Sequence, residues 1–88
     1  AEEWGLIWRC VPDESLMEEA MAMARQFAAA PTKGLAFTKR AMLESWGNTL
    51  EQQLQLEADM MRELGYSHDY REGVAAFLAK RPPQFKGE

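Results

Sequence analysis

Four segments of helical length fill most of the chain and constrain its fold more than any other feature. In each segment, apolar residues recur three or four positions apart, which is the period of a helix face. Pro31, Gly47 and Gly65 separate the segments, and such residues commonly begin or end helices. Only residues 6–11 are typical of an extended segment, because they are partly β-branched and stop at Pro12. The sequence therefore predicts an all-α fold of four helices with a short extended lead-in.

Capping residues predict where two of the helices begin. Ser15 and Glu18 have the spacing of a capping box, so the first helix is expected to begin at Ser15. It is expected to end before Pro31, because the residue preceding a proline is disfavoured in the helical conformation. Thr49 and Gln52 have capping-box spacing as well and are expected to open the third helix.

The other boundaries follow from similar signals. The second helix is expected to run from Pro31 or Thr32 to about Trp46, because proline suits the first turn of a helix. The third is expected to end at a Gly65 C-cap, and Ser67 is expected to cap the start of the fourth.

Each helix has one apolar stripe, and we expect these stripes to pack against a part of the protein outside the given residues. The stripes are Leu16, Ala20, Ala24 and Phe27; Leu35, Thr38, Met42 and Trp46; Leu50, Leu54, Met61 and Leu64; and Tyr70, Val74, Phe77 and Leu78. Phe37 falls on the opposite, polar side of the second helix. It is either a contact with something beyond the helix bundle or a lone exposed aromatic.

Two charged residues interrupt these stripes. Lys39 projects within the stripe of the second helix, and Glu57 projects within that of the third. Burying either charge alone would be costly, so we predict a structural ion pair between them that sets the register of the two helices. The alternative is that Lys39 extends its stem to water while Glu57 lies at a boundary.

Charge and cysteine content exclude several partners. The net charge of −4 disfavours nucleic acid and anionic membranes as partners, and the apolar runs are too short to cross a bilayer. The single cysteine, Cys10, cannot form an internal disulfide, which favours a reducing cytoplasm. We also expect a fragment of a longer protein, because Gly5 is placed like the C-cap of a helix and residues 6–11 have no partner strand.

No active site is evident in the sequence. It contains no Gly-rich phosphate loop, metal-ligand cluster or nucleophile elbow, so neither catalytic residues nor a metal are predicted. Near the end, Phe77 and Lys80 lie one helical turn apart, and Arg81 and Lys86 follow. Such a group could bind phosphate and stack on a ring, or it could be a surface helix with ordinary cations at its C-terminus.

Several short motifs together resemble the C-terminal third of the enoyl-CoA hydratase/isomerase (crotonase) superfamily. In order, they are Trp4-Gly-Leu-Ile7, Pro31-Thr32, Thr38-Lys39, Leu54-Gln-Leu-Glu57, the run from Glu72 to Arg81, and Phe85-Lys-Gly87. Residues 69–87 and the Ile7-Trp8 step are most similar to the bacterial isomerases of phenylacetate degradation, which convert ring-epoxidised phenylacetyl-CoA into an oxepin-CoA.

The resemblance implies a division of the chain and a role for it. Residues 1–12 would end the catalytic core of the parent enzyme, and residues 13–88 would form a C-terminal helical domain that builds trimers or hexamers. The catalytic acids and the oxyanion hole of the superfamily lie upstream of the matched region, so no catalytic residue is carried over. The substrate would be an acyl-CoA, with coenzyme A as part of the substrate and no permanently bound cofactor.

The resemblance also assigns a ligand contact. Phe77 and Lys80 match a Phe and a Lys that approach the adenine and phosphates of CoA in the superfamily, and Arg81 and Lys86 are secondary candidates. The alternative function is a non-enzymatic helical adaptor that binds a partner protein through its exposed apolar face, Phe37 included.

Overall fold

The computed structural model describes residues 1–88 and contains helices but no strands. The elements are a 3₁₀ turn η1 (Asp13–Ser15), α1 (Leu16–Ala28), α2 (Thr32–Ser45), α3 (Leu50–Gly65) and α4 (His68–Ala79). The predicted all-α class with four helices is confirmed. No helix combines the length and the apolar character needed to cross a bilayer.

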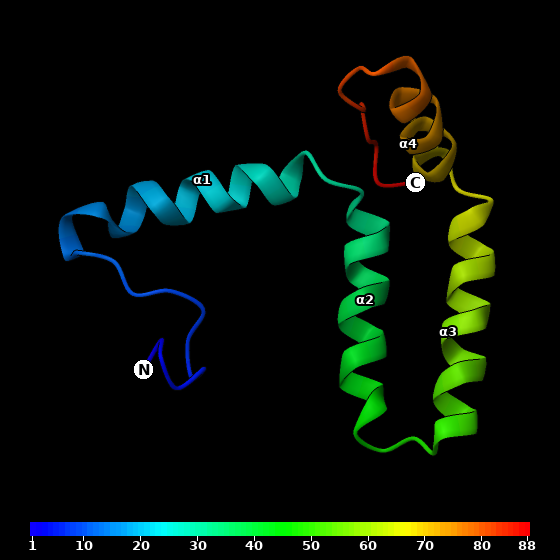
Figure 1. Ribbon diagram of the computed structural model, residues 1–88, viewed down its shortest axis with the longest axis horizontal. Helices are drawn as coiled ribbons and strands as arrows, with labels where there is room; N and C mark the ends of the chain where they lie inside the picture. The colour runs from blue at the N-terminus through cyan, green and yellow to red at the C-terminus, as the bar shows by residue number, and fades with distance from the viewer.

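The helices are arranged around one hairpin. Figure 1 shows α2 and α3 side by side and antiparallel, with α1 extending away from them and α4 standing at the open end of the hairpin. After α4 the chain reverses and ends close to the start of α2. We refer to residues 81–88 as the tail.

The chain is much more open than a compact protein of its length. Its radius of gyration is 16.5 Å, whereas about 12 Å is expected for a compact domain of this length. Its accessible surface is 7550 Å², compared with about 5,200 Å² for a compact protein of this mass. Only Met60, Asp69 and Ala76 are buried. Most of the apolar surface of the helices is therefore uncovered.

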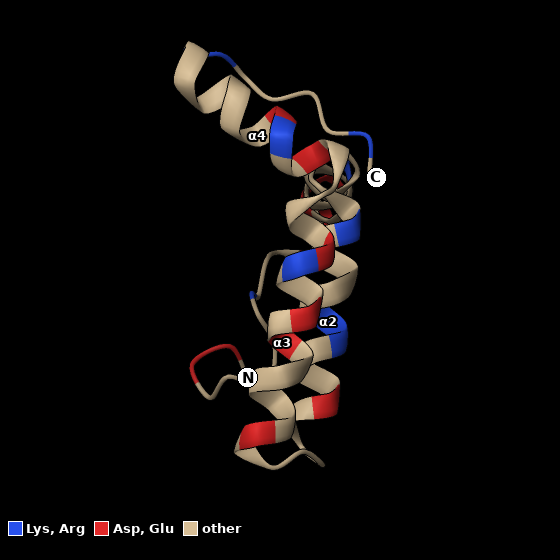
Figure 2. Cartoon of the chain, turned by 90° about the vertical axis from the view of Figure 1, so that its right-hand side faces the viewer, with Lys and Arg blue, Asp and Glu red and all other residues tan.

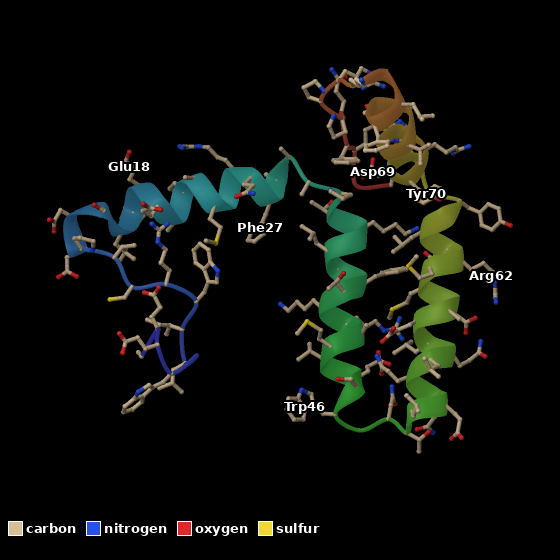
Figure 3. All side chains as sticks on the ribbon, in the orientation of Figure 1. Glu18, Phe27, Trp46, Arg62, Asp69 and Tyr70 are labelled. Carbon is tan, nitrogen blue, oxygen red and sulfur yellow. The ribbon has the colours of Figure 1, made fainter.

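Most residues of the apolar stripes are exposed. Figure 3 shows Trp46 and Phe27 projecting away from their helices, and Trp46 is 92% exposed. The other exposed large members of these stripes are Leu16, Leu35, Met42, Leu50, Leu54, Met61, Tyr70, Val74, Phe77 and Leu78. The periodicity identified the apolar faces, and no element of this chain covers them, as expected.

The hairpin packs through a different face of α2. Phe37 and Ala41 are half-buried against α3, where Gln53 and Met60 line the same groove. The prediction that Phe37 contacts something beyond the bundle, or stands alone, is therefore wrong. Two helices of a hairpin meet through whichever faces their short connection turns inward, and hydrophobic periodicity does not specify that face.

The predicted ion pair between Lys39 and Glu57 is not formed. Glu57 instead accepts a hydrogen bond from Gln53 Nε2 at 2.9 Å, and the pair that joins α2 to α3 is Lys33 with Glu63, also at 2.9 Å. The stripes that carry Lys39 and Glu57 face solvent in this chain, and both side chains are exposed. An exposed charge is solvated by water, so neither residue needs a partner.

Local signals predicted two of the three N-caps correctly. Thr49 and Gln52 form the complete capping box, with Thr49 Oγ1 accepting from Gln52 N at 3.2 Å. Ser67 accepts from Tyr70 N at 3.1 Å at the start of α4. Ser15 makes no such bond, because η1 precedes α1 and places Ser15 in the right-handed helical region, whereas a capping residue is extended.

The two predicted glycine C-caps differ. Gly5 has φ of 71°; its N–H donates to Glu2 O at 2.9 Å, and Leu6 N donates to Ala1 O at 3.0 Å. These are the two hydrogen bonds of a Schellman motif, a common helix ending, and residues 2–5 form a turn here. Gly65 is instead the last residue of α3 and has no left-handed conformation, so its predicted capping role is wrong.

Candidate functional site

A carboxylate on α4 reverses the chain at the end of that helix. Glu72 and Arg81 form a bidentate ion pair, with Nη1 to Oε1 at 2.6 Å and Nη2 to Oε2 at 3.0 Å. Glu72 Oε1 also accepts from the backbone N–H of Gln84 at 2.8 Å. The hydrogen bond from Arg81, followed by that from Gln84, lowers the pKa of Glu72 to about 2. Glu72 therefore stays ionised and holds the first half of the tail.

Asp69 holds the second half of the tail. Its two carboxylate oxygens accept from Lys86 N at 2.7 Å and from Gly87 N at 2.8 Å, while its own N–H donates to Glu88 O at 2.9 Å. His68 Nδ1 lies 3.1 Å from Asp69 Oδ1. Burial alone would raise the pKa of Asp69, but these hydrogen bonds outweigh it and lower the pKa below its usual value.

The tail covers one face of α4. Asp69, Glu72, Gly73 and Ala76 have the spacing of a single helix face. The Phe85 ring lies against Gly73, where an added Cβ would sit 3.6 Å from the ring, and Ala76 is only 1% exposed. The face of α4 that this chain buries thus consists of small and polar residues, and the tail covers it. The apolar face of α4 remains free.

Phe77 and Lys80 lie on the free side at the end of α4. The Phe77 ring is 83% exposed, and Lys80 is exposed without an ion pair. Lys80 is the only residue other than glycine with positive φ, at 52° with ψ of 42°. Its N–H donates to Phe77 O at 3.2 Å, and Arg81 N donates to Ala76 O at 3.0 Å, which closes the helix end. A ring and an ammonium group are therefore both available to a ligand there.

The four residues predicted for this site do not converge. Arg81 is occupied by Glu72, whereas Lys86 is bound through its backbone to Asp69 at the first turn of α4. Lys80 follows the last turn, so the two lysines lie on the order of 15 Å apart at 1.5 Å per helical residue. Figure 2 shows basic segments in blue where the chain leaves α4 and again near the C-terminus. Only Phe77 and Lys80 are placed together and free.

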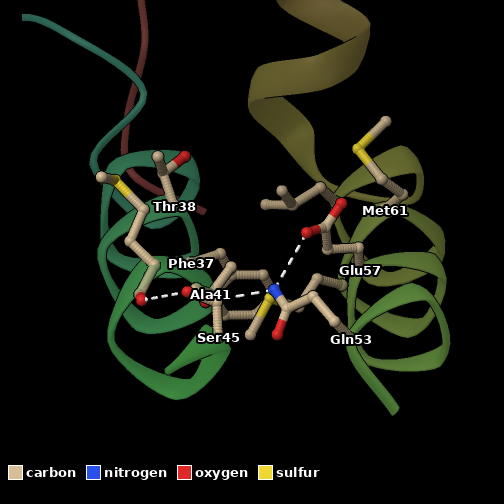
Figure 4. A pocket seen from close by; sticks show the side chains of 10 residues that line it. Phe37, Thr38, Ala41, Ser45, Gln53, Glu57 and Met61 are labelled. Carbon is tan, nitrogen blue, oxygen red and sulfur yellow. Dashed lines mark hydrogen bonds between the residues drawn. The ribbon is translucent and has the colours of Figure 1, made fainter. Parts of the chain in front are cut away.

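The sequence motifs did not reveal a groove between α2 and α3. Figure 4 shows its lining, which encloses about 390 Å³. Gln53 Nε2 bridges the two helices by donating to Ala41 O at 3.1 Å and to Glu57 at 2.9 Å. Phe37 and Ala41 line it together with Met42, Met61 and Leu64, which belong to the apolar stripes. Apart from the Glu57 carboxylate the groove is lined by apolar and neutral side chains, so it presents a surface for contact and no set of groups for proton transfer.

Comparison with known proteins identifies the family. The sequence profile described as enoyl-CoA hydratase/isomerase matches residues 1–88, and the chain belongs to this family. The 1,2-epoxyphenylacetyl-CoA isomerase of Escherichia coli (strain K12) is 53% identical over 88 residues, which cover 100% of this chain and 34% of that protein. A probable enoyl-CoA hydratase of Rhodobacter capsulatus is 46% identical over 87 residues, covering 99% of this chain and 34% of that protein.

Solved structures agree on the fold. The crystal structure of an enoyl-CoA hydratase from Polaromonas sp. JS666 superposes with a TM-score of 0.90 at 35% identity, over 97% of this chain and 33% of that one. The enoyl-CoA hydratase from Bacillus anthracis gives a TM-score of 0.89 at 32% identity, over 100% of this chain and 34% of that one. The chain thus spans about a third of the length of the relatives that it matches.

Proposed function

We propose that this chain is the C-terminal region of an acyl-CoA isomerase of the crotonase superfamily that acts on ring-epoxidised phenylacetyl-CoA in phenylacetate degradation. The observation that carries the proposal is the 53% identity, over the whole chain, to the E. coli 1,2-epoxyphenylacetyl-CoA isomerase. The probable hydratase of R. capsulatus is less similar, at 46%, which favours isomerisation over hydration. The match over the whole chain also favours this role over that of a stand-alone helical adaptor.

Within the parent enzyme, residues 13–88 would act in oligomerisation and in closing the CoA site, while residues 1–12 would end the catalytic core. The support is the uncovered apolar surface, since the chain exposes roughly 2,000 Å² more than a compact protein of its size. An area of this order is typical of permanent subunit interfaces. We expect a trimer or a hexamer, without catalytic groups from this region. Free Cys10 is compatible with a reducing cytoplasm.

Phe77 and Lys80 would contact the CoA moiety of the acyl-CoA substrate. An exposed ring offers a stacking surface for adenine, and an unpaired ammonium group one residue past the helix offers a point charge for phosphate. Coenzyme A would enter as part of the substrate, and no permanently bound cofactor is needed. Lys86 would be at most a contact to a different part of the ligand, because it lies at the other end of the tail.

The reaction is tested with the complete protein that contains this chain. It is expected to isomerise ring-epoxidised phenylacetyl-CoA with a kcat/KM well above that for hydration of a short enoyl-CoA. The reverse ranking would reject the isomerase assignment and leave the family intact. Lys80→Ala and Phe77→Ala are each expected to raise KM about tenfold with little change in kcat, because each removes a ground-state contact. Arg71→Ala removes an exposed basic residue without an ion pair on the same helix and serves as the matched control.

The oligomer is tested separately by sedimentation of the complete protein. Met42→Glu places a charge in the exposed stripe of α2 and is expected to shift the protein toward smaller species. Gln26→Glu adds the same charge at an exposed position of α1 without hydrogen-bond partners, and is expected to have no such effect. A monomer at all concentrations would contradict the oligomerisation role.

A further inference from the structure

The ion pair between Glu72 and Arg81 lies directly beside the free lysine at the end of α4. The Arg81 guanidinium has both terminal nitrogens on the Glu72 carboxylate, and Nη1 also donates to Pro82 O at 3.2 Å. The Glu72 side chain is only 15% exposed. The fork geometry of an arginine on a carboxylate fixes direction as well as distance. Arg81 is therefore anchored to the inner face of α4, while Lys80 is turned outward.

The backbone of Lys80 is held in a conformation that lysine does not favour. A left-handed residue with a Cβ costs about 1 kcal/mol or more, and helices usually place glycine at this position. Here two anchors surround it: its own N–H is bound to Phe77 O, and Arg81 N is bound to Ala76 O. The Arg81 side chain adds the pair with Glu72. With both sides of Lys80 fixed, its Cα–Cβ bond leaves the helix end in one direction, one turn after Phe77.

We propose that Arg81 is a positioning residue for the coenzyme contact: its pair with Glu72 holds Lys80 in its left-handed conformation and keeps the Glu72 carboxylate neutralised, and Arg81 does not itself bind phosphate. This inference rests on the proposed function, because it needs Lys80 to contact CoA. It replaces the sequence-based role of Arg81 as a secondary phosphate ligand. It also makes Glu72, which no motif singled out as a site residue, part of the same unit.

Electrostatics gives the pair a second role. Without Arg81, the Glu72 carboxylate would remain slightly more than two helical turns, roughly 12 Å along the helix, from Lys80 with no cation on it. That carboxylate would repel an incoming phosphate and attract the Lys80 ammonium group toward itself. Without Glu72, Arg81 would keep its charge but lose the anchor for the chain reversal. Loss of either partner should therefore weaken the same contact, although the two substitutions change the net charge in opposite directions.

The test uses the complete protein, with KM and kcat measured for the CoA thioester and for the matching pantetheine thioester, which lacks the nucleotide. Glu72→Ala and Arg81→Ala are each expected to raise KM for the CoA thioester about tenfold, the effect of losing one charge-assisted hydrogen bond. KM for the pantetheine thioester and kcat for both are expected to stay within about twofold, which also shows that the variants fold. The double variant is expected to raise KM no more than the larger single effect.

Two exposed charged residues provide matched controls, and two results would overturn the inference. Glu51→Ala and Arg71→Ala remove exposed charges without ion pairs and are expected to leave KM unchanged. If Arg81→Ala raises KM for the CoA thioester while Glu72→Ala lowers it or leaves it unchanged, Arg81 is itself the ligand and the inference is overturned. If both variants lose activity on the pantetheine thioester equally, the pair is only structural, and the inference is again overturned.

The failure of the inference can be told from the failure of the proposed function. If Lys80→Ala does not change KM for the CoA thioester, the coenzyme contact itself is wrong. If Lys80→Ala raises KM and the Glu72 and Arg81 variants do not, only the positioning role is wrong. Amide hydrogen exchange at Lys86 and Gly87 reports the attachment of the tail independently of any substrate, and it is expected to accelerate in both variants.

Discussion

The Lys33 ammonium in the first turn of α2 lies 2.9 Å from the Glu63 carboxylate in the last turn of α3. Each charge is at the unfavourable end of its own helix dipole, a cation at an N-terminus and an anion at a C-terminus. The pair offsets both penalties across the open end of the hairpin. Lys33 also lies 5.7 Å from the centre of the Phe37 ring, which points toward α3.

This geometry predicts a strongly non-additive pair. Lys33→Gln or Glu63→Gln alone is expected to cost about 0.5 kcal/mol of unfolding free energy, and the double variant no more than either single. Urea unfolding of all four proteins gives the coupling energy, which is expected to shrink at high salt because both side chains are partly exposed. Additive losses at any salt concentration would show that the two residues do not interact.

Gln53 is expected to stabilise the hairpin through its bond to the α2 backbone. Gln53→Ala leaves the Ala41 carbonyl without this partner and is expected to cost about 1 kcal/mol. Gln55→Ala is the matched control, since Gln55 bonds only to Asp59 on its own helix. Equal effects of the two substitutions in urea unfolding would contradict the role of Gln53.

Gly87 is expected to tolerate no side chain. It has φ of 78°, and an added Cβ would collide with the Thr32 hydroxyl at the start of α2. Gly87→Ala is therefore expected to cost about 1–2 kcal/mol from the backbone alone. Gly65→Ala meets nothing within 4 Å and is expected to stabilise α3 by about 0.5–1 kcal/mol. Thermal unfolding should move Tm in opposite directions for the two variants.

The two carboxylates that hold the tail predict acid sensitivity. Their folded-state pKa values lie below the ordinary values of 3.8 for Asp69 and 4.5 for Glu72, and that of Glu72 is about 2. A lowered folded-state pKa means that the stabilisation is complete above the unfolded-state pKa and is lost as the pH falls toward the folded-state pKa. Tm is thus expected to fall from about pH 5 to about pH 2. The fall should be smaller in Glu72→Ala, while Glu51→Ala should keep the wild-type slope.

The helices themselves were predictable because the interactions that define them are local. The capping box of Thr49 with Gln52 and the cap at Ser67 act within one turn, and both were read correctly from spacing. The end of α1 before Pro31 follows from proline sterics in the same way. Ser15 was the exception, since the short turn before α1 changed the backbone conformation that its cap required.

The candidate site was predictable only in part. Phe77 and Lys80 are close in the sequence, so helical spacing alone placed them together. The partners of Arg81 and Lys86 were not predictable, because Glu72 and Asp69 lie 9 and 17 residues before them. Such bonds depend on the chain reversing after Lys80, and the lysine at that position gave no glycine signal for a reversal.

The sequence by itself determined that four amphipathic helices form, where most of them begin and end, and to which family they belong. Only the tertiary structure decided which faces meet: Phe37 turned toward α3, Glu57 bonded Gln53 at the groove and left Lys39 unpaired, and the polar face of α4 was taken by the tail. The physical reason is the sequence distance over which each kind of interaction acts. Caps and periodicity act over a few residues, whereas the choice of a packing face depends on surfaces that are distant in the chain.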